Sequence, residues 1–334
     1  GLIILTMFSW AVPAQSQDVI VFASIEEVIE WLQTENFWGE ERRDDQLTVP
    51  RVILAGINPR WRTEAQQLPV SHKKEIFYRA LLPLILHANS MVLDRRTGLL
   101  RLKEALESGD EITVGDLEQV RSGAVLLRVV DEETAATLGP ADESFATIID
   151  ELLYKIDIIP AGLALGQAAY ESGYGTSRFA VEGNALFGQW TYGGKGLVPE
   201  QQRKSLGDHR IAAFDWPFDS VRGYFINLMS HPAYEDFRRL RAETRAAGRP
   251  LESVELADGL VKYSERGQEY VDTLKGIIRT NGLDIADDAV FRDEPMRFSI
   301  GADGETAAEA LRRDIEAMRV SGELAEIVAR MRLE

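Results

Sequence analysis

Cysteine is absent from this chain of 334 residues, and histidine occurs only four times. Without thiols the protein can form no disulfide, no thiolate zinc site and no cysteine nucleophile. The histidines are scattered and include no His-x-x-x-His pair, which argues against a zinc hydrolase. The sequence also lacks a Gly-x-Ser-x-Gly elbow and a complete Gly-x-x-x-x-Gly-Lys-Ser/Thr phosphate loop. It therefore indicates neither a serine hydrolase with a nucleophile elbow nor a phosphate-loop nucleotide-binding enzyme.

Basic residues are outnumbered: 37 Lys and Arg stand against 54 Asp and Glu, which gives a formal net charge of −17. Nucleic-acid backbones and anionic lipids both require clustered Lys and Arg. This balance therefore argues against a nucleic-acid partner and against electrostatic binding to a membrane, while a neutral glycan is compatible with it. A chain of this length can hold one large domain or two ordinary ones.

The apolar run near the N-terminus, Leu2–Val12, is too short to span a bilayer. It has the length of a signal-peptide core, and Val12-Pro13-Ala14 offers a small-residue cleavage site, although no basic residue precedes it. We therefore expect residues 1–17 to be a truncated signal peptide. The protein would then be exported to the periplasm or cell envelope and would have no stable membrane span. A buried strand is the alternative interpretation of this run.

Residues 18–140 are predicted to form a helical N-terminal region. Apolar residues recur at helical spacing in several segments, and Ser24 precedes the first of them as an N-cap. The predicted helices are Ile25–Gln33, His72–Val92, Leu99–Leu106 and Leu117–Val130. Pro83 lies inside the second of these and predicts a kink or a break there. Residues 49–59 alternate weakly, which suggests extended chain.

The turn cluster Gly139–Asp142 marks the boundary to a central region, residues 141–284. Pro160 suits the first turn of a helix, so Ala161–Glu171 is predicted to be a buried helix whose small residues let neighbouring helices approach closely. Residues 189–214, rich in Gly, Thr and aromatic residues, suggest a small β-hairpin lobe. Further helices are predicted at Phe145–Tyr154, Ser220–Leu228, Tyr234–Ala247, Glu252–Tyr263 and Glu269–Thr280. The expected fold class is α+β, mostly α.

Residues 285–334 are predicted to form a helical C-terminal extension, with a helix pair from Glu305 to Leu333 that Gly322 interrupts. Neither flanking region carries a cluster of His, acidic residues or glycines that suggests separate chemistry. Their amphipathic helices have apolar faces that a soluble monomer rarely leaves exposed. We expect both flanks to pack on the central region or on each other and to shape access to its site. Docking of a partner protein is the alternative.

One carboxylate is the strongest candidate for catalysis. Glu171 ends the predicted apolar helix, where Ser172-Gly173 breaks the chain, and a second glycine turn, Asn184–Gly188, follows. A carboxyl group in an apolar wall beside an aromatic-lined loop has a raised pKa and can hold a proton near neutral pH. An acid catalyst of glycosidic cleavage requires this property. Taken alone, Glu-Ser-Gly favours the alternative of an ordinary helix end with a solvated glutamate.

The longer pattern resembles a known family. Ala168-x-x-Glu-Ser-Gly-aromatic-Gly-x-Ser177, followed by Asn184-x-Leu-Phe-Gly188, is similar to the N-acetylglucosaminidase domain of glycoside hydrolase family 73, which hydrolyses peptidoglycan. The resemblance is closest to the Bax-type branch of that family. Matched segments continue in order within about Asp150 to Leu283: Gly188-Gln-Trp190, Gly196-Leu-Val-Pro199, Ala213-Phe-Asp215, His231-Pro-Ala-Tyr234, Tyr263-Ser-Glu-Arg-Gly267, Tyr270 and Ile277-Ile-x-x-Asn281.

The resemblance implies a lysozyme-like glucosaminidase domain with Glu171 as the catalytic glutamate. A second carboxylate can come from the β-lobe in this family, and Glu200, which follows Leu-Val-Pro, is the best candidate by position. Surface charge is the alternative role for Glu200 and for the other acids of the lobe, Glu182, Asp208 and Asp215. The N-acetyl group of the substrate could instead act as nucleophile. Tyr263 matches a tyrosine that the family keeps near its catalytic glutamate, where a phenol can position water or stabilise developing positive charge; an ordinary core tyrosine is the alternative.

Aromatic side chains of the motif are candidates for the substrate groove, because their faces suit the apolar faces of sugars. These candidates are Tyr174, Phe187, Trp190 and Tyr192, although any of them could be a core residue. Asn184 is expected to bond either the loop backbone or an N-acetyl group of the substrate.

The sequence as a whole predicts an exported hydrolase that cleaves the β-1,4 bonds of peptidoglycan on the N-acetylglucosamine side. Its partners would be glycan strands, and it would require no metal and no cofactor. The alternative, motivated by the unassigned second acid, is a cell-wall or glycan-binding module that keeps the fold and has lost turnover.

Overall fold

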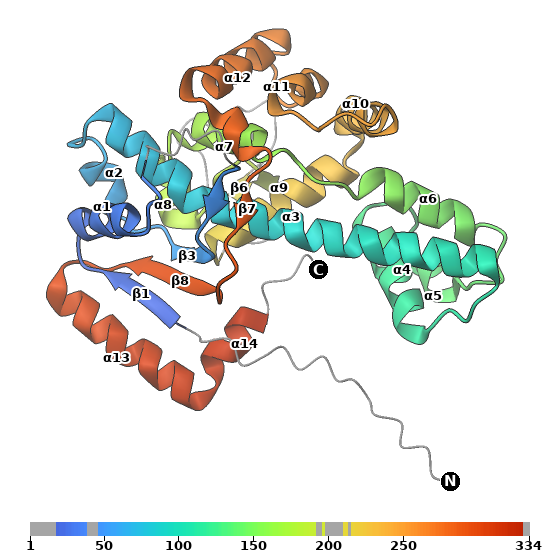
Figure 1. Ribbon diagram of the computed structural model, residues 1–334, viewed down its shortest axis with the longest axis horizontal. Helices are drawn as coiled ribbons and strands as arrows, with labels where there is room; N and C mark the ends of the chain where they lie inside the picture. The colour runs from blue at the N-terminus through green and yellow to red at the C-terminus, as the bar shows by residue number, and fades with distance from the viewer. Residues whose placement is uncertain (1–17, 39–45, 192–195, 198–209, 213–214, 330–334) are drawn as a thin grey trace.

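The computed structural model describes residues 18–38, 46–191, 196–197, 210–212 and 215–329. The predicted signal peptide, residues 1–17, lies outside the described residues. Most of the described chain is helical, with a few short strands (Figure 1), so the predicted fold class, α+β and mostly α, is confirmed. In Figure 1 the long helix α3 (Val70–Ser108) runs across the view, with α12 (Gln268–Asn281) above it and strands β1 (Asp18–Phe22) and β8 (Arg297–Gly301) below.

The two flanks of the chain meet in one parallel sheet. Strand β8 pairs on one side with β1 and on the other with β3 (Val52–Gly56). A second parallel pair joins β2 (Thr48–Val49) to β7 (Val290–Phe291). The extended chain predicted within residues 49–59 is confirmed by β3, whereas β1, β7 and β8 lie in segments for which no strand was predicted. Strands of a parallel sheet usually lack the clear alternation that marks a half-exposed strand in a sequence.

The long helix α3 corrects two predictions. It continues through Pro83, so of the kink or break predicted there the break is absent, and the helix predicted separately at Leu99–Leu106 is part of the same element. A proline inside a helix costs roughly 3 kcal/mol. Here Pro83 is buried between Leu82 and Leu84, themselves 3% and 0% exposed, so the packing of this helix offsets that cost.

By length and composition alone α3 could cross a membrane. However, 67% of its most apolar stretch is buried inside the molecule, as in the core helix of a soluble fold.

The other helices of the flanks are α1 (Ile25–Thr34), α2 (Trp61–Glu64), α4 (Val114–Leu126), α5 (Glu132–Thr137), α13 (Glu305–Ser321) and α14 (Glu323–Ala329). The predicted N-cap of α1 is confirmed, because the Ser24 side chain accepts from the backbone N–H of Glu27. The predicted interruption at Gly322 is confirmed as well.

The central region is built around helix α7 (Ala161–Ser172). It further contains α6 (Phe145–Lys155), α8 (Arg178–Gly183), α9 (Pro217–Ser230), η2 (Pro232–Tyr234), α10 (Glu235–Ala246), α11 (Ser253–Leu256), η3 (Ala257–Leu260) and η4 (Leu283–Ala286). The helix predicted at Glu252–Tyr263 is thus two short elements, α11 and η3. Strands β4 (Trp190–Thr191), β5 (Gly196–Leu197) and β6 (Arg210–Ala212) form the predicted β-lobe as a small antiparallel sheet in the order β4-β6-β5.

Every residue of α7 from Ala161 to Ala169 is buried. A Cβ at Gly162 would lie 2.4 Å from the carbonyl oxygen of Leu283, and one at Gly166 would lie 3.0 Å from Ile278. The predicted close approach of neighbouring helices is therefore confirmed. The carboxylate of Asp287 joins the first turn of α7 to α11, because it accepts from the backbone N–H of Gly162 at 2.9 Å and of Ser253 at 2.7 Å.

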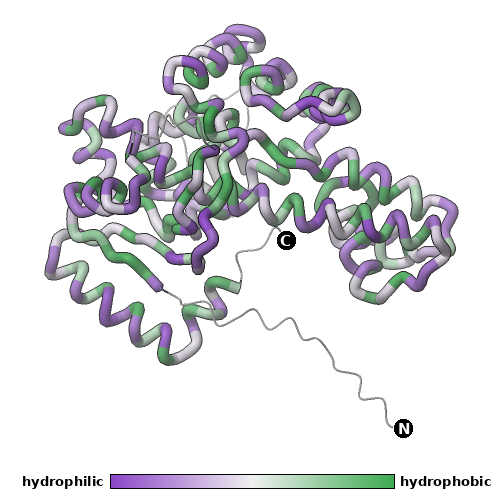
Figure 2. The backbone as a smooth tube through the Cα atoms, viewed as in Figure 1, coloured by the Kyte–Doolittle hydropathy of each residue, from purple (hydrophilic) through white to green (hydrophobic). Residues whose placement is uncertain are grey.

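The flanks and the central region share one hydrophobic core. Helix α3 contacts α6, α7 and α9, and its buried residues join those of α7 in a single cluster. Figure 2 shows hydrophobic residues gathered where these helices meet, whereas α13, at the lower edge, carries many hydrophilic residues. Helix α13 packs on β1 through Ala308, which forms a smaller cluster with Val21.

Because α3 covers α7 and α9, a fragment of residues 141–284 would expose the apolar faces that α3 now buries. We expect this fragment to be insoluble or to lack fixed tertiary structure, while the full chain gives dispersed side-chain NMR signals and a cooperative unfolding transition. Near-ultraviolet circular dichroism and NMR of both proteins would test this. A soluble, folded fragment with the activity of the full chain would contradict it.

Candidate active site

Glu171 lies in the last turn of α7, at the end of the buried helix, and is itself half-buried. Burial raises the pKa of its carboxyl group to about 7, although a hydrogen bond with Tyr270 acts in the opposite direction. The carbonyl groups at the C-terminal end of the helix also disfavour a negative charge there. Glu171 therefore has the property required of a general acid, since a large share of the molecules carry its proton at neutral pH.

The turn after Glu171, Ser172–Ser177, is shaped by local hydrogen bonds and is called here the Glu171 loop. The buried hydroxyl of Ser172 donates to the carbonyl of Ala168 at 2.6 Å and accepts from the N–H of Gly175 at 2.8 Å. Gly173, Tyr174 and Gly175 have φ values of 59°, 60° and 74°, so three successive residues are in the left-handed region. This conformation costs Tyr174 on the order of 1–2 kcal/mol, which surrounding contacts must offset.

A chain of buried hydrogen bonds leads to the Glu171 carboxyl group. The hydroxyl of Tyr224 donates to Gln167 Oε1 at 2.5 Å, and Gln167 Nε2 donates to the hydroxyl of Tyr270 at 2.9 Å. The hydroxyl of Tyr270 is in turn hydrogen-bonded to Glu171. Since Tyr270 already accepts from Gln167, its own proton is directed to the carboxylate, and each donor polarises the next.

Tyr263 lies beside this chain. Its ring is stacked on that of Tyr270 with centroids 5.6 Å apart, and its hydroxyl donates to the backbone carbonyl of Phe187 at 3.0 Å. Burial raises the pKa of Tyr263 well above its ordinary value, and the nearby Tyr270 and Glu171 contribute in the same direction. The phenol therefore stays protonated, and its oxygen keeps lone pairs with which it can accept from water.

The second motif segment, Asn184–Gly188, lies directly against the carboxyl group. A Cβ at Gly188, which has a φ of 61°, would lie 3.0 Å from Glu171 Oε2. Asn184, also left-handed with a φ of 48°, ends α8, and its side chain bonds the backbone. Its Nδ2 donates to the carbonyl of Asp215 at 3.3 Å, and its Oδ1 accepts from the N–H of Ile57 at 3.4 Å. Of the two roles predicted for Asn184, the structure shows backbone bonding.

The predicted groove aromatics are placed differently from one another. Phe187 is 1% exposed and stacked on Tyr224 with centroids 4.0 Å apart, so its prediction as a sugar-contacting ring is wrong and it is a core residue. Tyr174 is half-buried and packs against α3, where Phe77 and Tyr78 lie 5.7 and 5.9 Å from its ring. Tyr192 lies outside the described residues, as does the side chain of Trp190.

Two of the four candidates for the second acid are described. Glu182 is exposed and forms an ion pair with Arg178 at 3.4 Å, an (i, i+4) surface pair that fits the surface-charge alternative. Asp215 is also exposed, and its backbone carbonyl accepts from Asn184. Glu200 and Asp208 lie outside the described residues. Within the described part of the chain no group of three or more His, Asp and Glu side chains comes together as a metal site would require.

Sequence reasoning missed Gln167 and Tyr224 as parts of the site, and it assigned no role to Tyr270. Gln167 had a detectable signal, because it is a polar residue on an apolar helix, four positions before Glu171 and hence on the same face. Tyr224 had no such signal, because its helix is amphipathic and a tyrosine on the apolar side fits an ordinary core.

Comparison with known proteins assigns the central region to a class. Residues 146–283 match the glucosaminidase family, described as mannosyl-glycoprotein endo-beta-N-acetylglucosaminidase. The chain therefore contains a glucosaminidase domain, a lysozyme-like glycosidase domain that includes Glu171, the Glu171 loop and both tyrosines.

The chain is also similar to Protein bax of Escherichia coli (strain K12), with which it is 35% identical over 130 residues. The match covers 39% of this chain and 46% of that protein, so the chain spans about half the length of the curated relative that it matches. No solved structure matches the chain. The resemblance to a Bax-type protein with a glucosaminidase domain is confirmed.

The raised pKa of Glu171 predicts a pH-dependent cost in stability. The folded pKa of about 7 exceeds the unfolded value of 4.5, so the stability that protonated Glu171 contributes is complete below 4.5 and is lost as pH rises through 7. We expect Glu171→Gln, which is neutral throughout, to be more stable than wild type by roughly 2–3 kcal/mol at about pH 8.5 and by much less at about pH 5. Urea unfolding at both values measures this.

The control for this prediction is Glu182→Gln, which removes an exposed carboxylate of α8, between the two motif segments. It should change stability by less than about 1 kcal/mol at either pH. A difference between Glu171→Gln and wild type that is the same at both pH values would contradict the assigned pKa.

Proposed function

We propose that this protein is a peptidoglycan hydrolase that cleaves β-1,4 glycosidic bonds on the N-acetylglucosamine side, with Glu171 as general acid. The observation that carries the proposal is the environment of Glu171. A carboxyl group with a pKa of about 7 ends a buried helix inside a glucosaminidase domain, and Tyr270 is hydrogen-bonded to it. Peptidoglycan is the substrate that the motif resemblance implies.

In the proposed reaction Glu171 delivers its proton to the glycosidic oxygen as the bond to the sugar breaks. Burial keeps the acid protonated before the reaction, and the hydrogen bond from Tyr270 stabilises the carboxylate that the transfer leaves behind. Gln167 and Tyr224 hold the Tyr270 hydroxyl in the orientation that donates to Glu171. Burial and the Tyr270 hydrogen bond act in opposite directions on the pKa of Glu171. Together they give a carboxyl group that is protonated at neutral pH and is still able to release its proton.

The second half of the reaction needs a base or a nucleophile across the scissile bond. Glu200 keeps this role in the proposal because of its position after Leu-Val-Pro, and the N-acetyl group of the substrate is the alternative. Tyr263 supports either course. Its proton is donated to the Phe187 carbonyl, so its oxygen can orient a water molecule or face the developing positive charge. Trp190 and Tyr192 are proposed to contact the sugars from the β-lobe.

Digestion of purified cell-wall sacculi tests the proposal. We expect wild type to release muropeptides with N-acetylglucosamine at the reducing end, identified by mass spectrometry, and Glu171→Gln to lose at least about 100-fold in rate, because it cannot donate a proton. Glu182→Gln should digest sacculi at the wild-type rate. Binding to sacculi without release by wild type would overturn the enzymatic proposal in favour of a glycan-binding module.

The pH dependence of kcat/KM provides a second test. Activity should fall as pH rises through about 7, because Glu171 then loses its proton. Burial lowers the pKa of His231 below its ordinary value and that of His87 to about 4, so neither histidine accounts for a limb near 7. In Glu171→Asp, whose shorter side chain changes the environment of the carboxyl group, residual activity should show a displaced alkaline limb. If the alkaline limb of Glu171→Asp lies at the same pH as that of wild type, the limb reports the titration of another group.

Export to the periplasm or cell envelope is part of the same proposal, since peptidoglycan lies outside the cytoplasmic membrane. The apolar run Leu2–Val12 and the small-residue site after it support export. Fractionation of cells that produce the protein would contradict this if the protein remained with the cytoplasmic contents.

A further inference from the structure

Two of the left-handed residues of the motif are bonded to the N-terminal flank. The indole Nε1 of Trp61, in α2, donates to the backbone carbonyl of Tyr174 at 2.9 Å. The N–H of Ile57 donates to the side chain of Asn184 at 3.4 Å. Neither donor belongs to the region that matches the glucosaminidase family, residues 146–283. The conformation of the motif therefore depends on residues outside the glucosaminidase domain.

Of these two partners, Trp61 is the one bonded to the Glu171 loop itself. A Cβ at Gly175 would lie 3.3 Å from Trp61 Nε1 and 3.3 Å from Phe77, so the Glu171 loop lies directly on these two rings. Tyr174 is the only residue with a side chain in the left-handed run Gly173–Gly175, and it carries the carbonyl that Trp61 bonds. The bond thus acts at the residue for which this conformation is least favourable.

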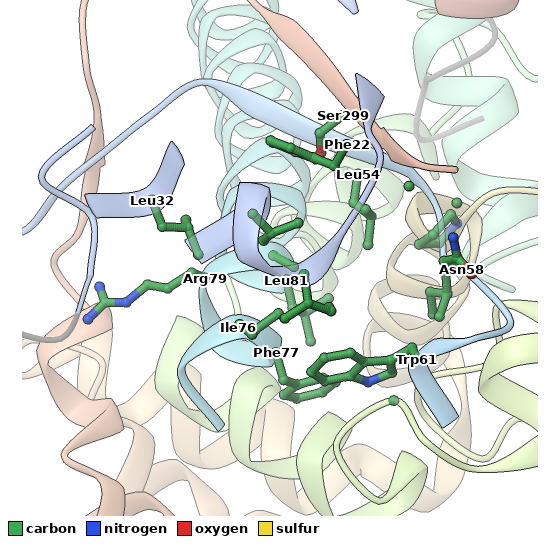
Figure 3. Close-up of a pocket in the computed structure, with 18 of the residues that line it drawn as sticks. Phe22, Leu32, Leu54, Asn58, Trp61, Ile76, Phe77, Arg79, Leu81 and Ser299 are labelled. Atoms are coloured by element: carbon green, nitrogen blue, oxygen red, sulfur yellow. The ribbon is translucent and has the colours of Figure 1, made fainter. Parts of the chain in front are cut away.

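The Trp61 ring is buried and also borders a cavity. Trp61 lines an apolar cavity of about 150 Å³ that lies mostly among residues of the N-terminal flank, and Phe77, Leu54 and Leu81 line it too. Figure 3 shows Trp61 and Phe77 together at one end of this cavity, with Phe22 and Ser299 at the other. The hydrogen bond from Nε1 to the Tyr174 carbonyl is directional, so it adds to the packing of the ring a preference for the orientation in which the ring supports the loop.

We propose that Trp61 is a positioning residue of the active site, and that the N-terminal flank holds the Glu171 loop in its catalytic conformation through the Trp61–Tyr174 hydrogen bond. The proposal rests on the proposed function in assigning the reaction to Glu171. The support of the Glu171 loop by the Trp61–Tyr174 hydrogen bond is a property of the folded chain and can be measured without substrate.

The test compares Trp61→Phe with Trp31→Phe in the full chain. Both changes remove an indole that lines the same cavity, but the ring contacts of Trp31 are with Phe22 and Arg297, away from the loop. The backbone N–H groups of Tyr174 to Ser177 are all hydrogen-bonded within the segment Ala169–Ser177, so their hydrogen exchange reports loop opening. We expect exchange in a peptide covering 172–177 to be about 3- to 10-fold faster in Trp61→Phe, the effect of one lost hydrogen bond, and unchanged in Trp31→Phe.

The same two variants are then compared on sacculi. Trp61→Phe should lower kcat by roughly tenfold or more with a smaller effect on KM, and should move the alkaline limb to lower pH because a looser loop admits water to Glu171. Trp31→Phe should leave kcat, KM and the pH of the alkaline limb unchanged. If Trp61→Phe does not fold, replacement of Trp61 by 3-benzothienylalanine keeps the bicyclic shape and removes only the N–H.

Exchange in 172–177 that is unaltered, or equally altered in both variants, would overturn the proposed role of Trp61 whatever the activity. If instead Glu171→Gln keeps full activity while hydrogen exchange in Trp61→Phe is accelerated, the proposed function is wrong. The proposed support of the Glu171 loop by Trp61 is then still confirmed.

Discussion

The arrangement of this molecule depends on a single requirement, which is that α7 be buried along its length and yet end in a carboxyl group. Its residues from Ala161 to Ala169 have no access to solvent that would hydrate a charge nearby. Small side chains on the helix let η4 and α12 approach until a single added Cβ would clash, as at Gly162. Glu171 therefore emerges among aromatic rings and backbone, and its pKa follows from that position.

Each partner of Glu171 is brought by an element that packs near α7. Tyr270 comes from α12, Tyr224 from α9, and Gly188 from the segment that follows α8. The geometry of the site is thus a consequence of helix packing, which is stiff because close-packed interiors do not deform continuously. Burial and hydrogen bonding act in opposite directions on the Glu171 carboxyl group, and their balance places its pKa near neutrality.

The flanks are structural parts of the same body. The strands β1 and β3 from the N-terminal flank and β8 from the C-terminal flank form one sheet, and Glu35 forms ion pairs with Arg292 and Arg297 at 3.2 and 3.1 Å. Helix α3 packs against α7 and α9, and so joins this assembly to the central region. A glucosaminidase domain that ended at the family boundary would lack α3 and the Trp61 bond to the Glu171 loop. For this chain, the family boundary and the physical boundary of the core differ.

The sequence by itself determined the features whose causes are local. Helical spacing, the Ser24 cap, Pro160 before α7 and the Gly322 interruption were readable because capping and periodicity involve residues within a turn or two of each other. The spacing of Glu171, Gly173 and Gly188 indicated the position of the candidate acid and the family for the same reason. Only the tertiary structure decided that α3 continues through Pro83, that β8 lies between β1 and β3, and that Phe187 is buried. It also decided that Gln167, Tyr270 and Trp61 reach the site. These features depend on contacts between residues far apart in the chain, and no local pattern specifies which distant side chain will cover a surface or complete a hydrogen bond.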